Sequence, residues 1–362
     1  MSERILVLAN KSGGLYSFRR ELLEALAKKG ELWAAIPNDG WFQELQQLGC
    51  RIMETPVDRR GINPVTDMKL LWRYIRMLRK MKPTRVITYT IKPNIYGGIA
   101  CRLLGVPYAV NITGLGTTFQ KEGWLKKLVI MLYKTALKGA DVVFFENRGN
   151  MQIMIDFGIV RQEQCCLLNG AGVNLEKFSF AAYPTEEETV RFLFIGRVMA
   201  EKGVNELFAA MERLVSEGFR CKLDVLGYYE EDYKKTIEGY VQQGWLEYHG
   251  FQSDVRSFVK KAHCFVLPSW HEGMANTNLE CAAMGRPLIT SNIHGCKEAV
   301  VEGISGLLCE PKCADSLYAA MRRFLEMRTE ERAAMGLAGR KHMEEVFDKQ
   351  KVVARTKKGL GL

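Results

Sequence analysis

Short runs of apolar residues alternate along the chain with longer stretches in which apolar residues recur every three to four positions. The short runs are typical of buried strands, and the longer stretches are typical of amphipathic helices. Near-continuous apolar strands separated by helices indicate parallel sheets that are covered on both faces. The predicted strands are ILVLA, LWAAI, RVITYT, YAVNIT and DVVFF in the first half, and RFLFIG, KLDVLG, CFVLP and PLITS in the second.

Two predicted helices of the first half, residues 67–81 and 123–138, combine an apolar face with many basic residues. Such a helix either covers a sheet with a solvated outer face or presents a surface that attracts anionic lipid. The residues of the second helix that would face a membrane are Trp124, Lys127, Lys134 and Lys138. Both interpretations are open at this point.

A polar stretch in the middle of the chain, FAAYPTEEET, separates the two groups of strands. A chain of 362 residues is long enough for two domains. We therefore predict an α/β protein with two doubly wound domains. The predicted segments are an N-terminal domain over 1–180, a linker over 181–189, a C-terminal domain over 190–345 and a tail over 346–362.

Composition places the chain among soluble globular proteins, with 47% hydrophobic and 25% charged residues. No apolar run approaches ~18 residues, and the start, MSERILVLANKSGG, does not match a secretory signal. The ten cysteines include no CxxC pair and no histidine at zinc spacing, so we expect buried thiols. These features predict a cytoplasmic protein.

Charge is distributed unevenly between the two halves. Residues 1–180 contain 26 Lys and Arg against 15 Asp and Glu, whereas residues 181–362 contain 25 against 26. The first half is therefore expected to meet an anionic partner, which could be a nucleic acid, a membrane surface or a phosphorylated substrate.

The predicted strand RFLFIG leads into a glycine-flanked turn, GRVMAEKG, that contains Gly196, Arg197 and Lys202. Such a turn at the carboxyl edge of a parallel sheet binds anions, because free N–H groups and the helix dipole point outward. The guanidinium and the ammonium add two positive charges, which suit a diphosphate.

A second strand, turn and helix, FVLPSWHEGMANTNLE, contains two glutamates eight positions apart. Gly273 would let the backbone approach a ligand, and the amides around Met274 and Ala275 would lie at the helix start. Glu280, in the helix, could accept hydrogen bonds from vicinal hydroxyls such as those of a ribose, and Glu272 could accept them from a second sugar. Alternatively, Glu272 could cap the helix and Glu280 could be a surface residue.

The motif order GRV-x3-KG, EG-x5-LE, AAMGRPLI and GCKEAV resembles glycosyltransferase family 4, as do KSGGLYSFRREL and NGAGVNLEKF. The resemblance covers nearly the whole chain. It implies the GT-B fold, with two Rossmann-like domains facing a central cleft and the nucleotide-sugar on the C-terminal one. It also implies that Arg197 and Lys202 hold the diphosphate leaving group, Glu280 the ribose and Glu272 the donor sugar, so that Arg197, Lys202 and Glu272 are the catalytic set.

Three segments, TYTIKPNIYGGIA, NITGLGTTF and FFENRGN, look most like bacterial N-acetylgalactosaminyltransferases that build undecaprenyl-diphosphate-linked glycans. This resemblance implies a retaining enzyme that uses a UDP-sugar, a lipid-linked saccharide acceptor and an anionic membrane surface on the inner face of the plasma membrane. We expect no cofactor and no metal, since no two aspartates are separated by a single residue. The predicted acceptor-side residues are Gly13, Gly14, Lys92, Asn111, Thr113 and Gly114.

The chain departs from the family pattern in four places. Ala275 replaces a common proline, and Asn174 replaces an aspartate. All five histidines lie in the second half, so Asn111 or Thr113 would have to serve where many relatives use a histidine. The ending ARTKKGLGL lacks the amphipathic pattern of a helix that crosses back to the first domain, so the course of the tail stays open.

Three other functions remain to be weighed. An NAD-dependent enzyme would need a strand that leads into GxGxxG, and the nearest sequence, GLGTTF, lacks the third glycine. A nucleotide-sugar epimerase of similar fold would form product from a UDP-sugar without an acceptor. A nucleic-acid-binding protein fits the pI of about 9.0, but no recognisable reading motif or aromatic platform accompanies the basic helices.

Overall fold

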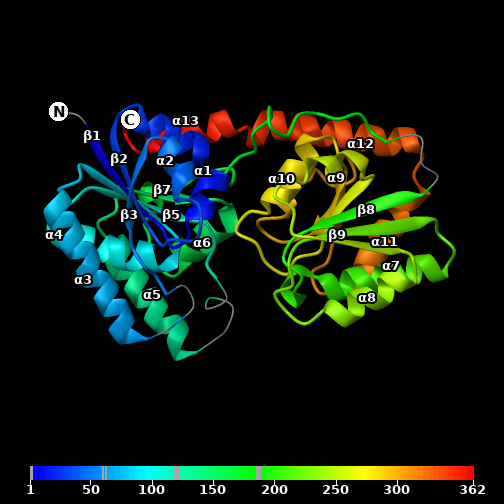
Figure 1. The fold of residues 1–362 in the computed structure, drawn as a ribbon, viewed down its shortest axis with the longest axis horizontal. Coiled ribbons are helices and arrows are strands. Elements are labelled where there is room, and N and C mark those ends of the chain that lie inside the picture. The colour runs from blue at the N-terminus through cyan, green and yellow to red at the C-terminus, as the bar shows by residue number, and fades with distance from the viewer. Residues whose placement is uncertain (1–2, 59–60, 62, 117–118, 120–122, 185–188) are drawn as a thin grey trace. The chain divides into compact units, whose positions relative to one another are not determined.

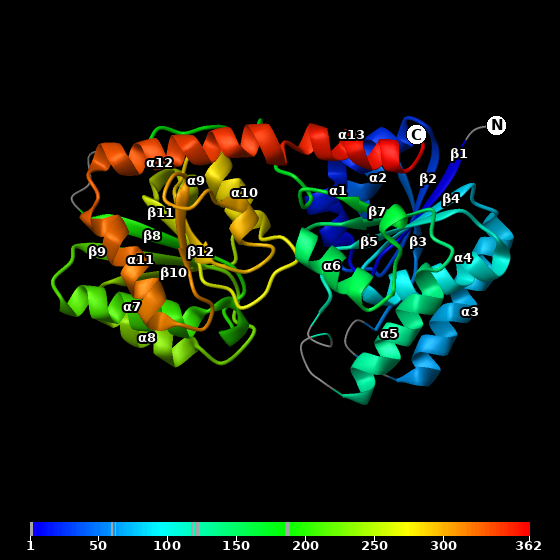
Figure 2. The same cartoon turned by 180° about the vertical axis from the view of Figure 1, so that it is seen from behind.

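The computed structural model describes residues 3–58, 61, 63–116, 119, 123–184 and 189–362, which form two compact units (Figures 1 and 2). The first unit contains the described residues up to Ala171 together with Gln350–Leu362. The second unit is Gly172–Lys349. Each unit has a parallel sheet between layers of helices, so the predicted doubly wound architecture is confirmed.

The sheet of the first unit has seven strands within the described residues, in the order β3-β2-β1-β4-β5-β6-β7, and every pairing is parallel. The strand order reverses direction between β1 and β4, which makes this the topological switch point where ligands of such sheets bind. The strands are β1 Glu3–Leu8, β2 Gly30–Ile36, β3 Cys50–Glu54, β4 Arg85–Tyr89, β5 Tyr108–Ile112, β6 Val142–Phe145 and β7 Cys165–Leu167.

Alternate side chains of this sheet pack into two separate cores. In β1, Leu6 and Leu8 pack into one core, and Ile5 and Val7 into the other, as the period of two in a strand requires. The first core is covered by α3 Pro64–Met81, η1 Pro93–Gly97, α4 Gly98–Leu104, α5 Trp124–Leu137 and α6 Arg148–Asp156. The second is covered by α1 Ser12–Ala27, α2 Phe42–Gln47 and α13 Lys349–Gly359.

The second unit has a six-stranded parallel sheet in the order β10-β9-β8-β11-β12-β13. Its order reverses between β8 and β11. The strands are β8 Val190–Ile195, β9 Cys221–Leu226, β10 Leu246–Gly250, β11 Cys264–Leu267, β12 Leu288–Ser291 and β13 Gly306–Cys309. The longer helices are α7 Val204–Ser216, α8 Lys234–Gln242, α9 Arg256–Lys261, α10 Asn276–Ala283, α11 Ala314–Glu326 and α12 Thr329–His342, and the short ones include η4 Ala200–Lys202 and η6 Met343–Phe347.

The division between the units lies at Ala171 and Gly172, before the predicted linker over 181–189. Gly172 has a φ of +70°, which favours glycine. Phe178 is already part of the hydrophobic core of the second unit. The carbonyls of Ala181 and Ala182 accept hydrogen bonds from the buried guanidinium of Arg286, so this part of the predicted linker is anchored to the second unit. Residues 185–188 of that linker lie outside the described residues.

The tail returns to the first unit, where its last residues complete one of the two cores. Val352, Val353 and Leu360 are buried among residues of β1 and α1. Gly359 lies against Phe144, since a Cβ at this glycine would be 2.7 Å from Cε1 of the ring. The apolar contact residues of α13 are too few to make the pattern visible in the sequence.

The ten cysteines are all free thiols, and seven of them are buried. Burial raises the pKa of Cys50 and Cys309 to about 12, so these thiols remain protonated at neutral pH. They behave as small core residues, as the sequence predicts.

Candidate active site

The first predicted turn of the second unit brings Lys202 to the end of the neighbouring strand β11. The chain leaves β8 through Gly196 and Arg197, forms η4, and enters α7 at Gly203. Gly203 has a φ of +74°, and a Cβ there would lie 2.1 Å from the carbonyl oxygen of Pro268. No larger residue fits this position without moving the backbone, so the two turns are held tightly together.

Lys202 and Glu272 form an ion pair in which both side chains are largely buried. The backbone N–H of Trp270 donates to the carbonyl of Glu201 at 2.9 Å, which fixes the second turn against the first. The two charges therefore neutralise each other. A diphosphate that binds here would compete with Glu272 for the Lys202 ammonium.

The second turn leads into α10, whose N-cap residue is Ala275. Met274 and Ala275 are buried, and the Ala275 N–H donates to the carbonyl of Gly295 at 2.7 Å. This amide therefore has a partner already, which differs from its predicted role in holding phosphate. The first N–H groups of a helix have no partner within it, so the amides of Asn276 and Thr277 are better placed to bind an anion.

Glu280 is the fifth residue of α10, and its side chain is partly buried. Burial raises the pKa of this carboxyl to about 7, although Lys177 and Lys349 oppose the shift. About half of the Glu280 side chains are therefore protonated at neutral pH. A ligand whose hydroxyls donate hydrogen bonds to the carboxylate would favour the ionised form.

A pocket of about 170 Å³ lies at the carboxyl ends of β8 and β9, next to Arg197. Two exposed aromatic residues, Tyr228 and Phe251, line it, and its walls are mainly apolar. Arg197 itself is partly exposed and lies 3.5 Å from the carboxylate of Glu230. The sequence analysis missed this pocket, although Phe251 directly follows Gly250 at the end of a strand. The pocket is lined by Ile195, Gly196, Arg197, Leu226, Gly227, Tyr228, Phe251, Gln252 and Val255.

Five of the six predicted acceptor-side residues follow strands of the first unit, at the carboxyl edge of its sheet, and the sixth, Asn111, lies within β5 near its carboxyl end. Gly13 and Gly14 lie in the first turn of α1. Thr113 and Gly114 follow β5 and are partly buried. The ammonium of Lys92 lies 2.7 Å from the carboxylate of Asp67, so this lysine also has a partner within the chain.

Asn111 is buried in a polar network beneath the switch point. Its Nδ2 donates to the carbonyl of Thr88 at 3.3 Å, and its own carbonyl accepts from Nδ2 of Asn94 at 2.8 Å. Asn94 Oδ1 accepts from the Thr88 hydroxyl at 2.7 Å. This network joins β4, β5 and η1, so Asn111 has a structural role, and of the two predicted substitutes for histidine only Thr113 is accessible.

Thr90, which the sequence analysis missed, has a φ of +72° directly after β4. A β-branched residue rarely adopts this conformation, which costs about 1–3 kcal/mol and is most common at functional sites. Thr90 is partly exposed at the switch point and is followed by the π-helix η1. Strain at one residue leaves no recognisable sequence signal.

The predicted membrane-facing residues of α5, Trp124, Lys127, Lys134 and Lys138, are all exposed. The side chains of Leu128 and Met131 are also exposed and extend the apolar stripe that begins at Trp124. Helices α3 and α5 both pack against α4 on the same face of the first unit's sheet (Figures 1 and 2), and α3 exposes a second stripe. This stripe consists of Val65, Met68 and Trp72.

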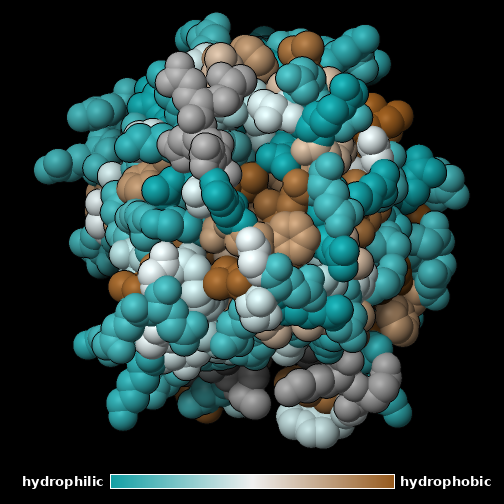
Figure 3. Space-filling view, turned by 90° about the vertical axis from the view of Figure 1, so that its right-hand side faces the viewer, coloured by the Kyte–Doolittle hydropathy of each residue, from teal (hydrophilic) through white to brown (hydrophobic). Residues whose placement is uncertain are grey.

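The face of the molecule in Figure 3, mostly from the second unit, has a different character. Hydrophilic side chains predominate there, and apolar ones form only small separate areas. Among the described residues, no helix is both long and apolar enough to cross a membrane.

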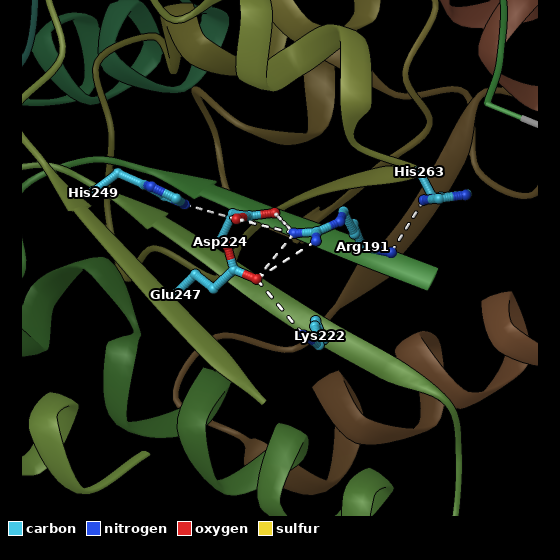
Figure 4. A network of polar contacts seen from close by, with 6 residues as sticks. All are labelled: Arg191, Lys222, Asp224, Glu247, His249 and His263. Atoms are coloured by element: carbon cyan, nitrogen blue, oxygen red, sulfur yellow. Dashed lines mark hydrogen bonds and ion pairs between the residues drawn. The ribbon is translucent and has the colours of Figure 1, made fainter. Parts of the chain in front are cut away.

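One group of carboxylate and imidazole side chains among the described residues could in principle hold a metal ion. It consists of Asp224, Glu247 and His249 on β9 and β10 (Figure 4). Arg191 lies 3.2 Å from Asp224 and 3.4 Å from Glu247, and His249 lies 2.7 Å from Asp224. Arg191 pairs with both carboxylates, and Lys222 lies 3.7 Å from Glu247. Because the two carboxylates already have these partners, and Arg191 lies near the start of β8, far along the strand from the turn that follows it, we assign the group a structural role.

Comparison with known families identifies both units. Residues 13–170 match the model of the glycosyl transferase 4-like domain, and residues 176–342 match that of glycosyl transferases group 1. The chain belongs to glycosyltransferase family 4. The two matches together span most of the transferase, and the motif residues of both turns lie within the second.

Two relatives align with most of the transferase. The chain is 27% identical over 341 residues to N,N'-diacetylbacillosaminyl-diphospho-undecaprenol alpha-1,3-N-acetylgalactosaminyltransferase of Campylobacter jejuni, covering 89% of each chain. It is 29% identical over 293 residues to UDP-Gal:alpha-D-GlcNAc-diphosphoundecaprenol alpha-1,3-galactosyltransferase of Escherichia coli, covering 75% of the transferase and 74% of the relative.

Among solved structures, Anabaena HepE, crystallised with UDP and glucose, superposes with a TM-score of 0.81 at 15% identity over 99% of both chains. This likeness establishes the fold. The transferase has the GT-B fold predicted from its sequence motifs.

Proposed function

We propose that this glycosyltransferase moves a sugar, an N-acetylhexosamine such as N-acetylgalactosamine, from a UDP-sugar to an undecaprenyl-diphosphate-linked saccharide in cell-surface glycan assembly. The observation that carries the proposal is the joined pair of turns in which Lys202 meets Glu272 at the start of α10. Both relatives described above are named for acceptors linked to diphosphoundecaprenol, and one is named for UDP-galactose.

The parts of a UDP-sugar match the groups around the two turns. The apolar pocket beside Arg197 suits the uracil, which could stack on Tyr228 or Phe251. Glu280 suits the ribose hydroxyls, and Arg197, Lys202 and the first amides of α10 suit the diphosphate. Once Lys202 turns to the diphosphate, the Glu272 carboxylate is released to accept hydroxyls of the donor sugar.

The proposed reaction retains the configuration of the anomeric carbon. The acceptor hydroxyl attacks from the face that the diphosphate leaves, and a phosphate oxygen of the leaving UDP takes its proton. No side-chain nucleophile is required, so the protein contributes by stabilising negative charge on the departing diphosphate. Arg197 and Lys202 supply the positive charge that stabilises it, and a resident metal ion has no part in the proposal.

Transfer should therefore proceed in excess EDTA. We would incubate the protein with UDP-N-acetylgalactosamine and a panel of N-acetylhexosaminyl-diphosphoundecaprenols, and follow the product and its anomeric configuration by NMR spectroscopy. We expect an α-linked product at a rate that EDTA leaves unchanged. Loss of activity in EDTA, a β-linked product, or conversion of the UDP-sugar without an acceptor would each contradict the proposal, and the last would indicate an epimerase.

We further propose that α3 and α5 attach the enzyme peripherally to the cytoplasmic face of the plasma membrane. Trp72 and Trp124 are 62% and 71% exposed, unusually high for tryptophan, and the lysines of α5 surround the apolar stripe. Tryptophan at the headgroup level and lysine near anionic lipid both stabilise such attachment.

Vesicle sedimentation tests this attachment. Binding to vesicles of phosphatidylglycerol and phosphatidylcholine should exceed binding to phosphatidylcholine alone. Each of Lys127→Glu and Lys134→Glu should weaken it by at least about fivefold, from ~1 kcal/mol per basic residue. Lys260→Glu, an exposed lysine of the second unit, is the matched control and should have little effect. Stronger binding to RNA than to anionic vesicles would instead favour a nucleic-acid-binding function.

A further inference from the structure

Two loops of the first unit meet at the carboxyl edge of its sheet and place aromatic and acidic side chains together. Strands β1 and β2 are paired and parallel, so the segments that follow them emerge side by side. The Ser12 N–H donates to both carboxylate oxygens of Asp39, at 3.1 and 3.2 Å, and the Ser12 hydroxyl also donates to Asp39. This contact fixes the loop after β2 against the start of α1.

The loop after β2 lays Trp41 over the first turn of α1. A Cβ at Gly13 would lie 2.9 Å from Nε1 of the indole, so only glycine allows Trp41 to approach this closely. Tyr16, one turn further along α1, stacks on Trp41 with ring centroids 5.1 Å apart and an angle of 27°. The guanidinium of Arg20 lies 5.7 Å from the centre of the Tyr16 ring.

Trp41 does not stabilise the local structure at the start of α2. It is the N-cap residue of α2, where aspartate, asparagine, serine or threonine would stabilise the helix by about 1 kcal/mol, and its side chain makes no capping hydrogen bond. Both Trp41 and Tyr16 remain partly exposed, although Tyr16 also packs against the core that α1 covers. A residue that breaks a local capping rule and stays partly exposed indicates a functional constraint.

The chemistry of the cluster fits a pyranose ring. The apolar C–H face of a sugar packs on an aromatic plane, and a fixed carboxylate accepts its hydroxyls. Asp39 is exposed, and its position is set by Ser12, so the oxygens keep the capacity to accept further hydrogen bonds. The guanidinium of Arg20 adds hydrogen-bond donors beside the Tyr16 ring.

We infer that Trp41, Tyr16 and Asp39 form the subsite that binds the saccharide of the lipid-linked acceptor. The inference rests on the proposed function, because it assigns the sugar of that acceptor to this cluster. The cluster distinguishes an acceptor that carries a sugar from the same lipid diphosphate without one. Donor binding, which the second unit provides, does not depend on it.

The test compares Trp41→Ala with the wild type in two measurements. The first is the KM for the N-acetylhexosaminyl-diphosphoundecaprenol that the wild type uses best, in detergent micelles. The second is the inhibition constant of sugar-free diphosphoundecaprenol. We expect the KM to rise about tenfold, as the loss of one aromatic stacking contact predicts. The inhibition constant, and the dissociation constant for UDP, should change less than twofold.

Two conservative variants serve as controls for a folding defect. Trp41→Phe and Tyr16→Phe keep an aromatic plane and should retain most of the wild-type affinity for the sugar-bearing lipid. An unchanged KM in Trp41→Ala would overturn the inference, and so would an equal rise in both constants, since that points to general damage. If the wild type transfers sugar to no lipid-linked acceptor, the proposed function fails and the subsite falls with it.

Discussion

Replacing Lys202 by alanine should lower kcat by about 10²- to 10³-fold while changing the KM for the UDP-sugar much less. This is the loss measured when one preorganised group that stabilises developing charge is removed. The physical reason is that the diphosphate must compete with Glu272 for the Lys202 ammonium, so the interaction of Lys202 with the diphosphate gains most as the leaving group becomes more negative. Steady-state kinetics with varied UDP-sugar would separate the two constants.

The ion pair calls for a specific control, because Lys202→Ala also leaves Glu272 without its partner. The double variant Lys202→Ala/Glu272→Gln removes that unpaired charge. If it regains wild-type kcat, the loss came from the stranded carboxylate and Lys202 has no catalytic role. A Lys202→Ala enzyme with normal kcat and a raised KM would likewise place Lys202 in donor binding alone.

The affinity for UDP-sugar should rise about tenfold between pH 6 and pH 8. Glu280 has a pKa of about 7, so its carboxyl is ionised in roughly one-tenth of the molecules at pH 6 and in roughly nine-tenths at pH 8. Ribose hydroxyls donate to the ionised form, so binding releases a proton and is favoured by higher pH. A UDP-sugar is the better probe because its diphosphate does not titrate in this range, and isothermal calorimetry would measure both the affinity and the proton release.

Glu280→Gln provides the matched control for this dependence. It keeps the size of the side chain and one acceptor oxygen but cannot titrate, so its affinity should be lower at pH 8 and nearly independent of pH. The sign of the effect identifies the group. An affinity that falls as the pH rises has the opposite sign and would contradict the role of Glu280.

All nine strands predicted from apolar runs form, and the four that the sequence analysis missed are the edge strands of the two sheets. An edge strand has one neighbour and more contact with water, so it needs no continuous apolar run. Three of the four show this directly, since they contain few fully buried positions. The missed strands are β3 CRIME, β7 CCL, β10 LEYHG and β13 GLLC.

The candidate site was predictable where it depends on strand, turn and helix in sequence. Lys202 and Glu272 both follow strands, and parallel neighbours bring such residues together at one edge. The sequence could not predict which residues of the chain form hydrogen bonds with the site residues or pack against them. The hydrogen bond of Ala275 to Gly295, the buried network of Asn111 and the approach of Trp41 to Gly13 all depend on tertiary packing.

The return of α13 to the first unit affects how this protein is made. The ribosome delivers the seven strands of that unit early, and domains commonly fold in order as they emerge. Here the unit that is synthesised first lacks Val352, Val353 and Leu360 until the whole second unit has been made. The apolar side chains of β1 and β6 that these residues cover therefore stay uncovered throughout synthesis of the second unit. During that interval the nascent chain presents an uncovered apolar surface, which is the kind of surface that chaperones bind.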